Sequence, residues 1–286
     1  MRRILAVLGG SDSDRKAAGA AIALAKRLGA QVEGLYIKID PSEVLARMGE
    51  GITASATGDV FEAALEDAEV AASRAKATLE SVATENGVAI HSTPSSLPGP
   101  GVFFESVQGP SLDVLDSHAG LADLVVFGEP GVPGPLGLMA KIEHTMLTLR
   151  RPILVARGDL SRNFGERVLV AFKGSHEACT ALMRATPIIK ASKAIEILYL
   201  REHDLDDHAG KRAARYLGQH GANAKLVEVK PGTSDIGAEI ARYARAGDAG
   251  LIVMGGYGRS RMRELILGGA TRHLIRSSPM PVFLAH

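Results

Sequence analysis

The chain has 286 residues, 46% of them hydrophobic and 23% charged, which is typical of a globular protein. Lysine and arginine total 33 against 32 aspartate and glutamate residues, so no positive excess exists to release counterions from a nucleic acid. The apolar part of the N-terminus, residues 4–8, is shorter than the about 7–15 apolar residues of a signal peptide. No run approaches the roughly 18–20 apolar residues that span a bilayer. We therefore expect a cytoplasmic protein that binds neither nucleic acid nor membrane. Cys179 is the only cysteine, which excludes a disulfide within the chain.

In the first part of the chain, short apolar runs alternate with helical patterns. We expect strands at 4–8, 31–37, 88–93 and 123–128 and helices at 14–28, 61–85 and 110–120, with a loop rich in glycine, serine and threonine at about 40–60. In the second part we expect strands at 167–172, 194–200, 223–229 and 250–254 and helices at 176–190, 207–220 and 234–246. This alternation predicts an α/β fold in which helices cover both faces of a parallel sheet. Ligands of such sheets bind at the carboxyl ends of the strands, where the strand order reverses.

The two parts of the chain resemble each other. Three pairs of segments match in the same order: 2–11 with 166–175, 122–131 with 249–258, and 151–157 with 280–286. Such ordered matches indicate a duplication, which we place at residues 1–158 and 164–286.

A glycine-rich stretch follows the strand at 250–254. Gly255 and Gly258 come directly after the strand, and a helical segment then leads to Gly268 and Gly269. Glycines at a helix N-terminus can bring backbone N–H groups close to a polyphosphate, and Thr271 could add a hydroxyl. The spacing is neither a Walker A loop nor a dinucleotide fingerprint. An equal alternative is that these glycines only cap helices and form turns.

The pattern G-x2-G-x9-G after a buried strand resembles the nucleotide loop of the universal stress protein family. The opening strands that end in Gly-Ser and the closing segment PMPVFLAH also resemble that family. The resemblance covers the whole chain. It implies two tandem, Rossmann-like domains, each with a five-stranded, mostly parallel sheet, packed as an internal pseudo-dimer. It also implies a stress-response regulatory protein that binds ATP or a related nucleotide, with or without Mg. The implied site residues are Ala171, Lys173, Leu200, Gly255, Gly258, Arg259, Gly268, Gly269, Ala270 and Thr271.

Two departures from the family pattern shape the prediction. Lys173 stands where ATP-binding members usually have an aspartate, so we predict that Lys173→Asp tightens ATP binding. The first copy keeps Gly128 and Gly131, but Lys141 replaces its third glycine and Glu129 would repel phosphate. We therefore predict one nucleotide per chain, in residues 164–286.

The N-terminal stretch GGSDS (9–13) resembles the phosphate loop of ATP-pyrophosphatase enzymes. The repeat explains it instead as a strand-to-helix turn, with Ser11 and Asp12 as candidate N-caps. An enzyme of that type remains the alternative, and a scaffold without nucleotide is another. No Ser/His/Asp or paired-carboxylate arrangement can be assembled, so any ATP hydrolysis is expected to be weak.

The remaining candidates favour structural roles. The stretch HDLDDH (203–208) more plausibly caps a helix than binds metal, and we expect no protein-bound metal. Cys179 is expected to be a small buried side chain rather than a nucleophile. The closing segments at 152–157 and 281–286 are expected to pair antiparallel within the chain. A homodimer is left open, and no protein partner is identified.

Overall fold

The computed structural model describes residues 1–38, 54–95, 98–130, 137–158, 160, 163–200, 208–230, 235–258 and 269–286, with the backbone alone for 54–61. The strands are β1 (Arg3–Leu8), β2 (Gln31–Lys38), β3 (Ala89–His91), β4 (Gly101–Gln108), β5 (Leu124–Phe127), β6 (Ile153–Val155), β7 (Arg167–Phe172), β8 (Ala194–Leu200), β9 (Lys225–Val229), β10 (Leu251–Gly255) and β11 (Val282–Ala285). The helices are α1 (Ser13–Leu28), α3 (Ala54–Glu85), α4 (Ser111–Ala119), α5 (Leu138–Leu147), α6 (His176–Lys190), α7 (Ala209–Gln219), α8 (Ile236–Ala246) and α9 (Gly269–Ser277). We call residues 1–158 the first half and residues 164–286 the second half.

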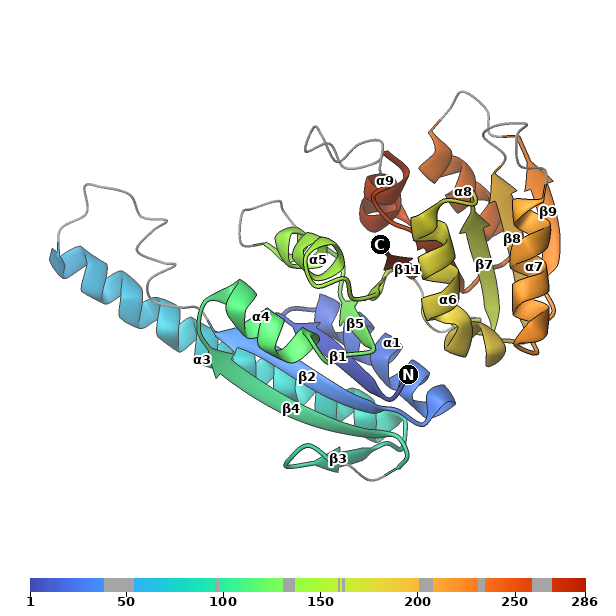
Figure 1. The fold of residues 1–286 in the computed structure, drawn as a ribbon. Helices are drawn as coiled ribbons and strands as arrows, with labels where there is room; N and C mark the ends of the chain where they lie inside the picture. Colours follow the sequence, from blue (N-terminus) through green and yellow to red (C-terminus); the bar gives the residue numbers. More distant parts are fainter. Residues whose placement is uncertain are drawn as a thin grey trace.

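All described strands form one sheet that runs through both halves (Figure 1). Its order is β3-β4-β2-β1-β5-β6-β11-β10-β7-β8-β9. Neighbouring strands are parallel within each half, and the one antiparallel pair among the described strands joins β6 to β11 with Leu154 opposite Phe283. The predicted antiparallel pairing of the closing segments is thereby confirmed, and the two halves form an internal pseudo-dimer.

Helices cover both faces of this sheet. Buried residues of α1, α3, α6 and α7 form one core cluster, and those of α4, α5, α8 and α9 form the other. The buried face of α1 is largely alanine, including Ala17, Ala18 and Ala21 at 0% exposure. Because a methyl group keeps the helix axis close to the sheet, this alanine face explains how α1 and α3 fit side by side on β1 and β2.

The first half differs from the expected five strands. It has six, because β4 pairs with β2 over eight residues, from Gln31↔Gly101 to Lys38↔Gln108. The sequence prediction missed β4, whose residues GVFFESVQ follow a Pro/Gly-rich stretch and carry polar side chains in mid-strand. The second half has the expected five strands. Helix α3 also begins at Ala54, earlier than the expected residue 61, and most of the expected loop at 40–60 lies outside the described residues.

In the part of the chain that the structure describes, every helix is too short or too polar to cross a membrane.

Candidate functional site

Each half has a point where the strand order reverses. In the second half, the chain leaves β7 toward β8 on one side and later returns to β10 on the other. In the first half, β1 lies between β2 and β5 in the same way. The carboxyl ends of β7 and β10, and of β1 and β5, therefore border the two crevices in which this architecture binds ligands.

The turn after β7 leads directly into α6. Gly174 adopts φ +79°, a left-handed conformation that suits glycine, and Ser175 caps the helix by accepting a hydrogen bond from the Ala178 N–H at 3.3 Å. Lys173 thus lies at the exit of β7, where the sequence placed it. Ala171 and Leu200, at the ends of β7 and β8, are only 6% and 5% exposed, so their side chains belong to the core.

The glycines after β10 fall into two classes. A Cβ added at Gly255 would lie 2.5 Å from the Ala178 nitrogen, and one at Gly256 would lie 2.8 Å from the Met146 sulfur. These two glycines are needed for packing. Among the described residues, a Cβ at Gly258 would meet nothing nearer than 3.8 Å, and one at Gly269 would meet nothing within 4 Å. Close packing with the described part of the chain therefore does not account for Gly258 and Gly269.

Tyr257 connects this turn to the first half. It is a non-glycine residue at φ 54°, and only 9% of it is exposed. Burial and the neighbouring carboxylate of Glu143, on α5, raise the pKa of the Tyr257 hydroxyl. Because Met146 of the same helix lies against Gly256, the turn after β10 is held against α5 on both sides of its bend. The sequence pattern gave no indication of this contact.

Lys173 and Glu177 both border Gly258. The Lys173 Nζ and the Glu177 Oε2 each lie 3.8 Å from the position of a Cβ at Gly258. Glu177 is 4% exposed; burial raises its pKa, but hydrogen bonds from its own backbone N–H and from Ser175, with the charges of His286 and His176, lower the pKa overall. The crevice therefore holds a cation beside an ionised carboxylate.

Helix α9 begins at Gly269, so Gly269, Ala270 and Thr271 form its first turn. Thr271 is 4% exposed, and Ala270 packs against the core. Arg259 and Gly268 lie outside the described residues. The structure thus places Lys173 and Gly258 together and puts Gly269 at a helix N-terminus, while Ala171, Leu200 and Thr271 are buried.

The equivalent crevice of the first half is filled by a side chain of the chain itself. The Asp14 carboxylate accepts the Gly9 N–H at 2.9 Å and the Gly10 N–H at 2.7 Å. A Cβ at Gly10 would lie 2.6 Å from atoms of Ala71, so α3 also closes over the turn. Burial raises the pKa of Asp14, and the backbone hydrogen bonds oppose that rise. The amides that a phosphate loop would offer are already occupied.

The ends of α1 and β5 complete this closed arrangement. Of the two candidates, Asp12 is the N-cap residue of α1, although its side chain accepts no capping hydrogen bond; the carboxylate of Asp14 reaches the turn instead. Glu129, after β5, pairs with Lys16 of α1 at 2.6 Å. The pair neutralises Glu129 but leaves it in the crevice. Lys141 lies in the first turn of α5, and residues 131–136 lie outside the described part.

Two other sequence candidates can be placed. Burial raises the pKa of the half-buried Cys179 thiol, which fits a structural rather than a nucleophilic side chain. Of the stretch 203–208, only His208 is described, and it immediately precedes α7.

Comparison with known proteins gives a consistent result. Residues 165–286 match the model of the universal stress protein family. The universal stress protein Slr1230 of Synechocystis is 24% identical, in an alignment that covers 99% of both chains. A solved universal stress protein from Archaeoglobus fulgidus has a TM-score of 0.66 at 18% identity, covering 99% of this chain and 97% of its own. A functionally unknown protein from Pseudomonas aeruginosa has a TM-score of 0.57 at 14% identity, covering 100% and 92%.

Proposed function

This chain belongs to the universal stress protein family, and we propose that its second half binds one ATP or related nucleotide while its first half binds none. The protein would act as a stress-response binding module rather than as an efficient enzyme. Its first half would serve as a scaffold that holds the nucleotide turn in place.

The observation that carries this proposal is the contrast between the two crevices. The repeat aligns Gly9-Gly10-Ser11 with Lys173-Gly174-Ser175, so Ala178 is the counterpart of Asp14. The methyl group of Ala178 cannot accept the hydrogen bonds that the Asp14 carboxylate accepts from backbone N–H groups in the first half. The second half therefore has no counterpart of the Asp14 carboxylate at this position, although the Glu177 carboxylate borders its crevice beside Gly258.

The phosphates would lie between Gly258 and the N-terminus of α9. A helix N-terminus offers backbone N–H groups and the positive end of the helix dipole. As far as the described residues define the space, Gly258 and Gly269 leave room where other residues would carry a side chain. Lys173, with its Nζ close to Gly258, would supply a positive charge to the phosphates. Mg could accompany the nucleotide as a phosphate ligand.

A carboxylate for the adenosine end would come from a different position than in the family. The resemblance assigns this role to an aspartate where the chain has Lys173. Glu177 is an ionised carboxylate in the first turn of α6, four residues after Lys173, and the Lys173 ammonium, which also borders Gly258, would offset its charge toward the phosphates. We therefore assign the acceptor role to Glu177, with Lys173 as its neighbouring counter-charge.

Isothermal titration of the full chain with Mg-ATP tests the proposal. We expect one site per chain in the wild type and no detectable binding for Gly258→Val, whose side chain would project into the phosphate space. Glu129→Ala is the matched first-half control and should leave both stoichiometry and affinity unchanged. Binding that survives Gly258→Val but changes in Glu129→Ala would mean that the nucleotide binds in the first half. AMP in a parallel titration shows whether the polyphosphate is required.

The same variants separate the alternatives. An ATP-pyrophosphatase-type enzyme would need the backbone N–H groups of Gly9 and Gly10 to bind phosphate. Both groups already donate hydrogen bonds to the Asp14 carboxylate. Steady turnover at roughly 1–1000 per second, lost in Asp12→Ala and kept in Gly258→Val, would establish that enzyme instead. Absence of binding by ATP, ADP and AMP would leave the interaction scaffold.

A further inference from the structure

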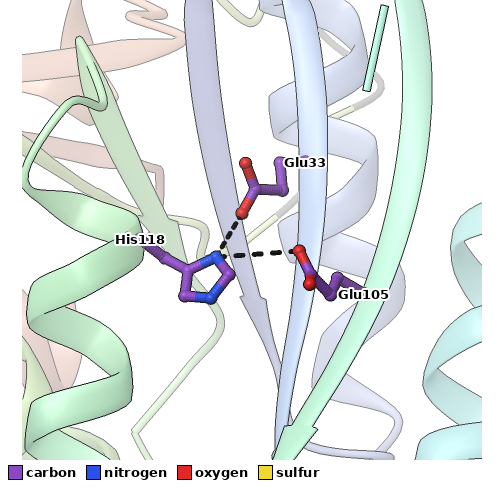
Figure 2. Close-up of side chains that lie close together, drawn as sticks. All are labelled: Glu33, Glu105 and His118. Atoms are coloured by element: carbon purple, nitrogen blue, oxygen red, sulfur yellow. Dashed lines mark hydrogen bonds and ion pairs between the residues drawn. The ribbon is translucent and has the colours of Figure 1, made fainter. Parts of the chain in front are cut away.

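Three side chains with metal-binding atoms meet in the first half, away from both crevices (Figure 2). They are Glu33 on β2, Glu105 on β4 and His118 on α4. Glu33 is the third residue of its strand, so the group lies toward the amino end of β2, whereas the crevices lie at carboxyl ends. We call these three residues the Glu33 cluster. The cluster is separate from the proposed nucleotide site.

One atom from each residue points to a common centre. The His118 Nδ1 lies 2.6 Å from the Glu33 Oε1 and 3.9 Å from the Glu105 Oε2, as the dashed lines in Figure 2 show. All three atoms lie within 4.8 Å of one another. Among the described residues, no other group of three or more histidine, cysteine or acidic side chains converges in this way.

Arg3 forms hydrogen bonds to two members of the cluster. Its guanidinium donates to the Glu33 Oε2 at 2.5 Å and to the His118 backbone carbonyl at 3.0 Å. The contacts leave the other oxygen of Glu33, Oε1, directed at the imidazole. Hydrogen bonds of this kind, from an outer group to a carboxylate ligand, are typical of protein metal sites.

We propose that the Glu33 cluster binds a divalent transition-metal ion of the zinc class. The ion would replace the proton shared between His118 Nδ1 and Glu33 Oε1, with Glu105 as third ligand and water as the fourth. Imidazole nitrogen and carboxylate oxygen are ligands that Zn²⁺ accepts in tetrahedral sites. With neutral imidazole, two carboxylates and one guanidinium leave the group one negative charge for a cation to neutralise.

The geometry needs little adjustment. Bonds of about 2.0–2.1 Å in a tetrahedron place ligand atoms about 3.3 Å apart. The 2.6 Å separation must therefore widen and the 3.9 Å separation must shorten, each by less than about 1 Å. The two carboxylate oxygens lie within 4.8 Å of each other, so they must approach by at most about 1.5 Å. The side chains of Glu33 and His118 are 12% and 16% exposed, and that of Glu105 is 42% exposed. Glu105 thus lies where an ion can enter from solvent.

Another histidine–carboxylate pair provides the control. His144 Nε2 lies 2.5 Å from Asp116 Oδ1, and their side chains are 18% and 43% exposed. This pair is as short as the first, with comparable exposure, but it is not part of any three-ligand group found among the described residues. His144→Ala therefore removes an equally exposed imidazole without touching the proposed site.

The test uses the tag-free full chain, stripped of metal with a chelator. Titration with Co²⁺, followed by visible absorption, and with Zn²⁺, followed by calorimetry, should each show one equivalent bound. His118→Ala and Glu105→Gln should each weaken binding at least about tenfold, and His144→Ala should not change it. Because Glu105 is half exposed, Glu105→Gln retains the fold if His118→Ala does not. Unchanged binding in Glu105→Gln, equal loss in His144→Ala, or no binding by wild type would each overturn the proposal.

Discussion

Gly255 and Gly258 should respond oppositely to the addition of one methyl group. A Cβ at Gly255 would lie 2.5 Å from the Ala178 nitrogen and 2.6 Å from the Glu177 carbonyl carbon, which are backbone atoms that cannot rotate away. The end of β10 or the start of α6 must then shift, and overpacking of this kind costs about 1–3 kcal/mol. At Gly258 the nearest atoms are the Glu177 Oε2 and the Lys173 Nζ, both at 3.8 Å and both at the ends of flexible side chains.

The difference is large enough to measure as a melting temperature. At about 2.1 cal/mol/K per residue, the unfolding entropy of this chain is roughly 0.6 kcal/mol/K, so Gly255→Ala should lower Tm by about 2–5 °C. Gly258→Ala should change the free energy of unfolding by less than about 0.5 kcal/mol and Tm by less than about 1 °C. Neither glycine has a positive φ, so the backbone conformation does not confound the comparison. Thermal melts followed by circular dichroism give both values. Equal Tm values for the two variants, or a larger loss for Gly258→Ala, would refute the division of these glycines into packing and ligand-facing classes.

Three further substitutions test the pairing of β6 with β11 and the two crevices. Phe283→Ala, in the fully buried β11, should lower the free energy of unfolding, measured in urea, by about 3–5 kcal/mol. A loss below about 1 kcal/mol would mean that the region where β6 pairs with β11 is not a packed core. Asp14→Ala should cost about 2 kcal/mol, because two amides lose a charged acceptor, whereas Asp12→Ala should stay within about 0.5 kcal/mol; similar urea midpoints for both would contradict the closed crevice. The sequence pattern predicts that Lys173→Asp tightens nucleotide binding, but the substitution would put a second carboxylate beside Glu177, so calorimetry should instead find weaker binding; tighter binding would support the sequence prediction and return the acceptor role to position 173.

Most of the fold could be predicted from the sequence, because the second half has clean periodic signals. β7, α6 and β8 begin and end where apolar patterning placed them. β4 could not be found in the same way. It follows a Pro/Gly-rich stretch, and its polar residues Glu105 and Ser106 break the apolar run, while its pairing with β2 is a tertiary contact that no local pattern encodes.

The candidate site was predictable only in part. Glycine spacing located the turn after β10, but it could not separate Gly255, which packs on α6, from Gly258, which has no close contact with any described residue. That distinction depends on atoms far away in the sequence. The contact of Tyr257 with α5 and the closure of the first crevice by Asp14 are of the same kind. The Glu33 cluster could not be found from the sequence either, because one of its three members, Glu105, lies on β4, the strand that the sequence pattern missed.

Native mass spectrometry of the full chain, with and without Mg-ATP, tests the central claim most directly. The account predicts a mass increase of one nucleotide per chain for the wild type and for Glu129→Ala, and no increase for Gly258→Val. Two nucleotides per wild-type chain, or one nucleotide retained by Gly258→Val, would contradict the assignment of the site to the second half.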